Sequence, residues 1–345
     1  MSLQQDYKNI VQRKVFLLIG FTLLTGFVFL WDISSGPLTI PVIDVLKVLL
    51  TLPVDDPHYA LVILEVRLPI AIMAILVGVF LSISGAQMQT ILNNPMADPF
   101  TLGISSGASL GAGLAIVLGI STIGVWGKYM VVANAFVFAM GASFVVYLVS
   151  KMRSVTSETM ILTGIAIMFA CGSVLSILQM LATERSLQAL TFWTMGSLTS
   201  ANWNILMIFT IALVMVSPFF IKNMWALTVI RLGDETARSL GVNVETLRIR
   251  ILFIVSVLSA ISVSFVGTIG FVGLVAPHIA RLMVGEEQRF FAPLTAVLGA
   301  FILSCASLIS KSVVPGMILP IGVITAVVGL PFFMFMILKN KKNVF

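Results

Sequence analysis

Long runs of apolar residues separated by short polar segments dominate the chain. The first run extends from Val15 to Trp31, after a polar start that ends in Arg13 and Lys14. The later runs lie at 69–89, 104–120, 129–150, 160–182, 204–221, 250–267, 268–284, 292–310 and 318–338. A helix of about 20 mostly apolar residues spans the hydrocarbon of a bilayer. The pattern therefore predicts an all-α, polytopic membrane protein of about ten transmembrane helices.

Two places in this pattern admit a second interpretation. A basic start followed by an apolar run is also typical of a secretory signal peptide. The run 15–31 is long for one, and no clear Ala-x-Ala site follows it, so we expect a retained first helix. No polar loop divides 250–267 from 268–284. We place the break at 267–270, which contains two glycines, whereas one kinked helix there would leave nine spans.

The composition indicates a lipid environment. Hydrophobic residues make up 59% of the 345 residues, charged residues only 10%, and the mean hydropathy is +1.10. Soluble domains carry about 25% charged residues, so this chain could not cover a water-facing surface. Ten spans leave no room for a large soluble domain. We expect one membrane domain over 15–338, with cytoplasmic ends at 1–14 and 339–345.

The distribution of charge predicts the orientation. If both ends lie in the cytoplasm, the cytoplasmic segments hold 15 of the 20 Lys and Arg residues and the external segments hold 5. Lys and Arg concentrate on the cytoplasmic side of short loops. The bias therefore favours an even number of spans with both termini in the cytoplasm. The net charge of +6 is a topology signal, and we expect no binding to nucleic acid.

The sequence lacks the patterns of common catalytic and metal sites. Its two histidines, His58 and His278, are far apart, and no His, Cys and carboxylate cluster has metal-ligand spacing. A Ser-His-Asp set and the phosphate-binding pattern G-x-x-x-x-G-K-[ST] are missing too. We therefore predict no enzyme activity and no cofactor. The spans also lack the mid-membrane charge of many ion-coupled carriers, so energy for transport is expected to enter through a partner.

Several polar or glycine-rich segments follow one another along the chain in a specific order. They are R-L-P at 67–69, S-G-A-Q-M-Q at 84–89, N-P-M-A-D-P at 94–99, L-G-I-S-S-G-A at 102–108, L-G-D-E-T-A-R-S-L-G-V at 232–242, G-F-V-G-L-V-A-P-H at 270–278 and L-P-I-G at 319–322. In this order and spacing they resemble the FecCD-type permeases of ABC importers, which take up iron-siderophores, haem and vitamin B12. The resemblance covers nearly the whole chain.

The charged segment 232–242 predicts a short capped helix. Asp234 and Glu235 stand early, Arg238 stands later and Gly241 closes the run. A solvated connector is the simpler alternative. In the resembling family this helix docks into a groove on the ATPase subunit and transmits its closure. The resemblance implies a coupling loop at 223–249, with contact residues Asp234, Glu235, Ala237, Arg238, Leu240 and Gly241.

Arg67 is predicted to begin a helix at the external face, because a proline at position 69 suits a first helical turn. The arginine could simply extend to the interface. In the resembling family, external arginines receive glutamates of a solute-binding protein, which suits bidentate pairing. The resemblance implies this role for Arg67 and Lys311. Ile70 stands where a second arginine often follows, so the docking surface would be less basic or centred elsewhere.

The resemblance also implies a gate and a pathway. Thr156 and Ser157 match a cytoplasmic gate position, although Ser and Thr at a helix start are also common N-caps. Met168, Gln179 and Met180 could line the pathway, although methionine often fills packing gaps between helices.

These features together predict the permease subunit of an ATP-driven importer in the bacterial cytoplasmic membrane. Its expected solute is a metal chelate, first of all a ferric siderophore, with haem, cobalamin and molybdate as alternatives. The expected partners are ATP-binding cassette ATPase subunits, a second identical or sister permease, and an extracellular or periplasmic solute-binding protein. An ion-coupled secondary carrier with a broken-helix ion site is the alternative from another class.

Overall fold

The computed structural model describes residues 3–54, 56–122, 126–152, 157–314 and 316–340, which contain helices and no strands. The α-helices are α1 (Leu3–Ser34), α2 (Val42–Leu49), α3 (Pro57–Val62), α4 (Leu68–Ile91), α5 (Ile104–Val117), α6 (Gly127–Met152), α7 (Ser157–Leu181), α8 (Glu184–Met195), α9 (Trp203–Val229), α10 (Asp234–Ser239), α11 (Val244–Val266), α12 (Val272–Val284), α13 (Gln288–Ser312) and α14 (Ile321–Asn340). The π-helix η1 (Ile63–Arg67) leads into α4, and η2 (Ile120–Thr122) and η4 (Ile230–Leu232) are short 3-10 turns.

Each of the ten predicted apolar runs forms one helix. Seven helices in the described part of the chain are long and apolar enough to cross a membrane, and shorter apolar helices are α5, α12 and the Ile321–Met334 part of α14. The predicted break is confirmed, because α11 ends at Val266 and α12 begins at Val272. A helix of 14 residues is about 21 Å long, shorter than the roughly 30 Å of bilayer hydrocarbon. The connections next to the short helices therefore reach into membrane depth, where protein must bury them.

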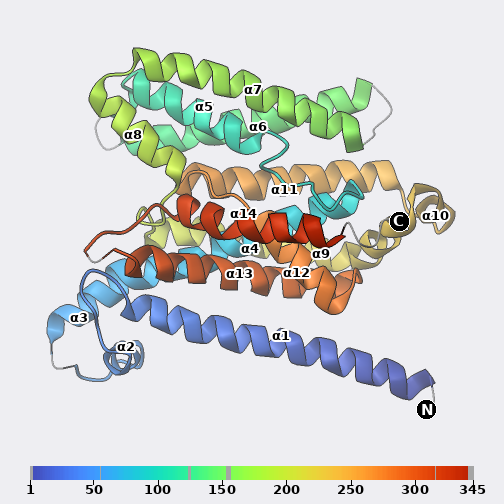
Figure 1. The fold of residues 1–345 in the computed structure, drawn as a ribbon, viewed down its shortest axis with the longest axis horizontal. Helices are drawn as coiled ribbons and strands as arrows, with labels where there is room; N and C mark the ends of the chain where they lie inside the picture. Colours follow the sequence, from blue (N-terminus) through green and yellow to red (C-terminus); the bar gives the residue numbers. More distant parts are fainter. Residues whose placement is uncertain (1–2, 55, 123–125, 153–156, 315, 341–345) are drawn as a thin grey trace.

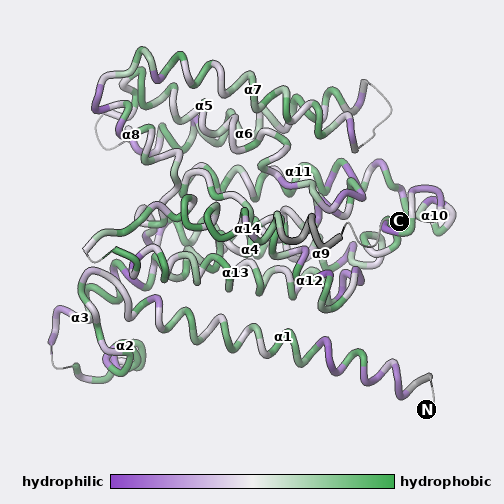
Figure 2. Tube along the Cα trace, viewed as in Figure 1, coloured by the Kyte–Doolittle hydropathy of each residue, from purple (hydrophilic) through white to green (hydrophobic). Residues whose placement is uncertain are grey.

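The long helices lie side by side and define two ends (Figure 1). The start of α1 and the short helix α10 lie at one end, which we call the α10 end; α2, α3 and α8 lie at the other, the α2–α3 end. Figure 2 shows that hydrophilic residues gather toward these ends, while the middle of the bundle is mostly hydrophobic. This arrangement is that of a multi-pass membrane protein.

Helix α4 lies at the centre of the bundle and packs against α9, α11, α12 and α13. Two of its glycines permit close backbone contact. A Cβ on Gly78 would lie 2.4 Å from the Gly299 carbonyl oxygen of α13, and one on Gly85 would lie 1.9 Å from the Gly273 carbonyl oxygen of α12. Small residues allow such close helix packing in membranes. The interior of α4 therefore packs directly against α12 and α13.

The connection between α9 and α11 is shorter than the predicted loop at 223–249. Helix α9 continues to Val229 and α11 begins at Val244, so only 230–243 connects them. Hydropathy marks where a helix leaves the hydrocarbon, but the backbone keeps its i to i−4 hydrogen bonds beyond that point. The predicted loop therefore comprises the end of α9, the connection 230–243 and the start of α11.

Candidate functional site

The segment between α9 and α11 contains the short helix α10. Asp234 and Glu235 lie in its first turn and Arg238 in its last, the charge order expected of a short capped helix. Gly233 and Gly241 flank it with φ angles of +105° and +84°, conformations that glycine adopts without strain. Between Asp234 and Leu240, the exposed side chains are Glu235, Thr236, Arg238, Ser239 and Leu240. Helix α10 therefore turns a mixed polar and apolar face outward.

The inner side of α10 is anchored by an apolar and an ionic contact. Ala237 is fully buried in a cluster that includes Ile230. Arg248 of α11 donates to both carboxylate oxygens of Asp234, at 3.1 and 3.3 Å, and to the Ile91 carbonyl at 2.8 Å. A six-residue helix is not stable alone. These contacts therefore hold α10 against α11 and the end of α4, and Asp234 serves the chain itself.

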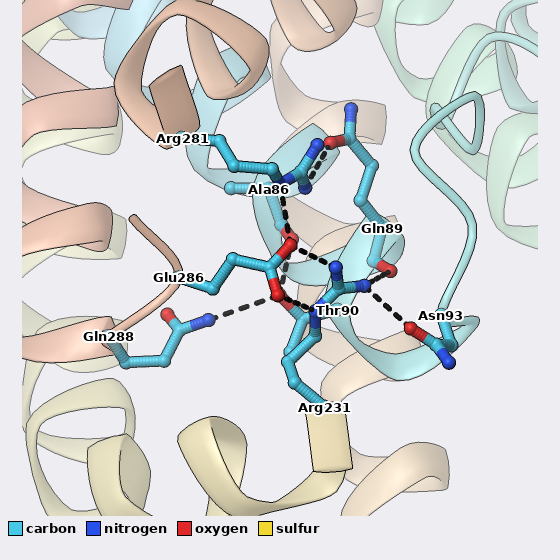
Figure 3. Close-up of polar contacts among 8 residues, drawn as sticks. All are labelled: Ala86, Gln89, Thr90, Asn93, Arg231, Arg281, Glu286 and Gln288. Atoms are coloured by element: carbon cyan, nitrogen blue, oxygen red, sulfur yellow. Dashed lines mark hydrogen bonds and ion pairs between the residues drawn. The ribbon is translucent and has the colours of Figure 1, made fainter. Parts of the chain in front are cut away.

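Two arginines share one glutamate beside α10 (Figure 3). Glu286, between α12 and α13, accepts from Arg231 of η4 through its Oε2 at 3.1 Å, and its Oε1 lies 2.9 Å from the Arg281 Nε of α12. Arg231 also donates to the Asn93 Oδ1 at 2.8 Å, and Arg281 donates to the Gln89 Oε1 at 2.9 Å. We call Arg231, Arg281 and Glu286 the Arg–Glu–Arg cluster. It joins the end of α9 to α12 and to the end of α4.

The stability of the Arg–Glu–Arg cluster depends on its single anion. Without Glu286, two like charges would face each other with no compensating carboxylate. Hydrogen bonds to charged groups contribute about 1.5–3 kcal/mol each, and the Arg231 and Arg281 side chains are largely shielded from solvent. Glu286 is therefore the residue whose loss most directly separates η4 from α12.

Buried glutamines extend this cluster into the bundle. Gln288 Nε2 donates to the Thr90 Oγ1 at 3.1 Å, and Gln288 Oε1 accepts from the Gln87 Nε2 at 3.0 Å. Gln89 Nε2 donates to the Gly273 carbonyl at 3.3 Å. Hydrogen bonds between buried side chains help to hold packed helices in one register. The S-G-A-Q-M-Q segment therefore links α4 to both α12 and α13.

Asp98, in the connection between α4 and α5, lies against the start of α12. A Cβ on Gly273 would be 2.7 Å from the Asp98 Oδ1, and the Phe100 N–H donates to that oxygen at 3.5 Å. Burial raises the pKa of Asp98 to about 7, and the hydrogen bond from Phe100 opposes this rise. Ionisation of Asp98 therefore affects the contact between this connection and α12.

At the α2–α3 end, Arg67 is buried rather than exposed. Its Nη1 donates to the Ile33 and Ser34 carbonyls at 3.0 and 2.8 Å, and its Nη2 donates to the Leu38 carbonyl. The guanidinium thus holds the connection after α1 against η1. The last turn of α1 and the connection after it enclose this side chain, and the docking role of Arg67 stays a prediction.

Lys311 is also enclosed, with a side chain that is 5% exposed. Its Nζ lies 2.9 Å from the Asp32 Oδ1, and the other oxygen of Asp32 accepts from Ser307 at 3.0 Å. This buried pair joins α13 to the end of α1. The charge of Lys311 is therefore paired within the chain in this structure, and its docking role stays a prediction.

The predicted gate and pathway residues lie on or before α7. Thr156 lies outside the described residues, as does the side chain of Ser157, so the gate stays a prediction. Met168 and Gln179 are half-buried and Met180 is 87% exposed. Only 11% of the apolar window of α7 is buried, compared with 61% for α11. Much of α7 is thus open to lipid or a partner, and pathway lining stays a prediction.

The Arg–Glu–Arg cluster was not singled out from sequence. The sequence offers one signal for this cluster: Arg281 is a charged residue within an apolar run, and Glu286 follows that run. Their pairing with Arg231 depends on tertiary packing across distant segments. Within the described ranges, no three His, Cys, Asp or Glu side chains are grouped so that they could hold a metal ion.

An all-helical multi-pass bundle with this ordered set of motifs defines a membrane transport permease. The profile of the FecCD transport family matches residues 23–339, and the chain belongs to that family. The resemblance found from sequence is thereby confirmed. The family consists of transport permease subunits of ABC importers rather than of enzymes.

Relatives named for different solutes are similar over most of the chain. The hemin transport system permease protein of Yersinia pestis is 33% identical and covers 82% of this chain and 84% of its own. The molybdate import system permease protein of Haemophilus influenzae is 31% identical, with coverage of 95% and 96%. A solved ABC transporter, described as metal-chelate type and inward-facing, superimposes with a TM-score of 0.82 at 30% identity, over 93% of this chain and 98% of its own.

Proposed function

We propose that this chain forms the translocation pathway for a metal chelate, with a ferric siderophore as the leading solute class, in a bacterial cytoplasmic membrane. The metal-chelate description of the similar structure and the hemin relative support a bulky chelate. The molybdate relative shows that solutes diverge at this level of identity. Haem, cobalamin and molybdate are therefore the competing solutes to test.

The proposed assembly contains two permease chains, each a single domain over 15–338. The exposed face of α7 supports pairing with a second permease, identical or a sister. A solute-binding protein docks at the α2–α3 end, and ATP-binding cassette ATPase subunits dock at the α10 end. Hydrolysis then belongs to the ATPase subunits, and this chain contributes the pathway and the mechanical connection.

The observation that carries this proposal is that α10 is exposed on one side and held by an ion pair on the other. Helix α10 turns Glu235 and Leu240 outward, while Arg248 and the Arg–Glu–Arg cluster fix its surroundings to α4 and α12. A partner that moves α10 therefore moves the ends of central helices, because the intervening polar groups are bonded rather than loose. Rigid-body motion of packed elements is a common way to open and close a pathway.

Co-purification tests ATPase docking. Glu235→Lys together with Leu240→Ala alters only exposed groups of α10 and is expected to remove most of the ATPase subunit from the purified complex. Glu184→Lys makes the same charge change on an exposed residue at the α2–α3 end and is the matched control. Equal retention of the ATPase by both variants would contradict docking at α10.

Uptake into vesicles tests the solute class. The assembled complex, with its own binding protein, should import a labelled ferric siderophore in an ATP-dependent manner, and unlabelled haem, cobalamin or molybdate should compete poorly. Preferential import of one of these three solutes would replace the siderophore assignment while leaving the importer function intact. Uptake driven by an ion gradient without ATP would contradict the importer itself.

A further inference from the structure

A groove of about 450 Å³ runs between α6 and α11. It is lined by Met140, Ser143, Phe144, Tyr147, Ile249, Arg250, Leu252 and Phe253. Both helices are long and apolar enough to cross a membrane. The volume is within the range of sites that bind small molecules. The groove is therefore large enough for part of a lipid acyl chain and lies on membrane-spanning helices.

The walls and floor of the groove suit hydrocarbon. Phe144 and Phe253 are 57% and 61% exposed along its sides. The hydroxyls of Ser143 and Ser256 are hydrogen-bonded to each other at its floor, and Ser256 also donates to the Leu252 carbonyl. These serines therefore leave little unsatisfied polarity. An acyl chain that enters the groove therefore breaks no hydrogen bond of the protein, and it covers exposed aromatic surface.

One cation, Arg250, lines the groove, and a second, Lys151, lies one helical turn beyond the lining residue Tyr147 on α6. Arg250 is exposed and makes no hydrogen bond or ion pair with any residue of the described ranges, unlike Arg248 two positions earlier. Lys151 follows Tyr147 by four residues on α6, so both lie on the same helix face. Both cations stand toward the α10 end of their helices. Basic pockets between membrane helices on the cytoplasmic side bind anionic lipid headgroups.

We propose that the α6–α11 groove binds one anionic phospholipid, with an acyl chain between Phe144 and Phe253 and the phosphate against Arg250 and Lys151. The apolar walls of the groove account for binding of the acyl chain, and the two cations account for selection of an anionic headgroup. The bound lipid bridges α6 to α11, which directly follows α10. This inference concerns a lipid ligand and is independent of the solute and of ATPase docking.

Native mass spectrometry of the full-length protein tests the proposal, with dioleoyl phosphatidylglycerol and dioleoyl phosphatidylcholine as probes. The unchanged protein should retain one phosphatidylglycerol in preference to phosphatidylcholine. Each cation near a lipid surface contributes about 1 kcal/mol, equivalent to about fivefold in affinity. Arg250→Gln should therefore weaken phosphatidylglycerol binding about fivefold, and Arg250→Gln with Lys151→Gln about thirtyfold. Lys222→Gln, an exposed cation of α9, should have no effect.

A second variant keeps the charges and fills the groove. Met140→Trp should also reduce phosphatidylglycerol retention, with an unchanged melting temperature as the check on folding. Three results would overturn the proposal: equal retention of both lipids, full retention by the Arg250 and Lys151 double variant, or cross-linking that places a second copy of the chain in the groove.

Discussion

The two ends of the bundle use charge in opposite ways. At the α2–α3 end, Arg67 and Lys311 are buried and bonded to the connection after α1 and to Asp32. At the α10 end, half-buried arginines anchor the inner side of a short helix, while Glu235, Thr236, Arg238 and Ser239 of that helix are exposed. The first arrangement closes α1 onto the bundle, and the second leaves a surface for contact. A charge at a helix end thus indicates a partner only where its neighbours leave it free.

The largest expected effect on stability comes from a substitution that breaks the buried Asp32–Lys311 pair at the α2–α3 end. Lys311→Met removes the ion-pair partner of the buried Asp32 and leaves only the more distant charge of Arg67 to act on it. Removal of one partner from a buried pair costs about 3–5 kcal/mol. The melting temperature in detergent should fall strongly. Lys128→Met, an exposed lysine at the same end, should leave it unchanged.

A double replacement sharpens this prediction. Asp32→Leu with Lys311→Met removes both charges of this pair, and most of the lost stability should return, because the remaining cation, Arg67, keeps its hydrogen bonds to backbone carbonyls. If the single and double variants were equally unstable, packing rather than charge pairing would hold α1 to α13.

A smaller and pH-dependent effect is expected at Asp98. Its pKa is raised from 3.8 to about 7 in the folded chain, so the unfolded chain loses this proton first as pH rises. The folded state therefore loses stability as pH rises between about pH 4 and pH 7. Asp98→Asn removes this loss. Its melting temperature should exceed that of the unchanged protein more at pH 7.5 than at pH 5.5.

The exposed Asp6 supplies the control for this pH series. Asp6→Asn should follow the unchanged protein at every pH. A constant offset between Asp98→Asn and the unchanged protein would mean that Asp98 carries the same charge in the folded and unfolded states.

The smallest effect on stability is expected on the outer face of α10. Leu240→Ala removes a half-exposed side chain, and surface changes of this kind stay within about 0.5 kcal/mol. Thermal unfolding should be nearly unchanged. A large loss of stability would mean that Leu240 serves the fold rather than a partner surface.

Sequence patterns predicted the ten helices, the break at 267–270 and the charge order of α10, because each depends on neighbouring residues. They did not predict the enclosure of Arg67, since the residues that cover it belong to the connection after α1. They also missed Glu286, whose two arginines come from segments far apart in the chain. Apolar periodicity therefore defines the helices, whereas the partners of polar residues depend on how these helices pack.

The most direct test of the account measures transport and ATP hydrolysis together in complexes that carry Glu286→Gln. This change leaves the outer face of α10 intact but removes the anion shared by Arg231 and Arg281. The account predicts that the ATPase still assembles and hydrolyses ATP while solute uptake falls about tenfold or more, which corresponds to about 1.4 kcal/mol of lost coupling. Uptake per ATP equal to that of the unchanged complex would contradict transmission through this cluster.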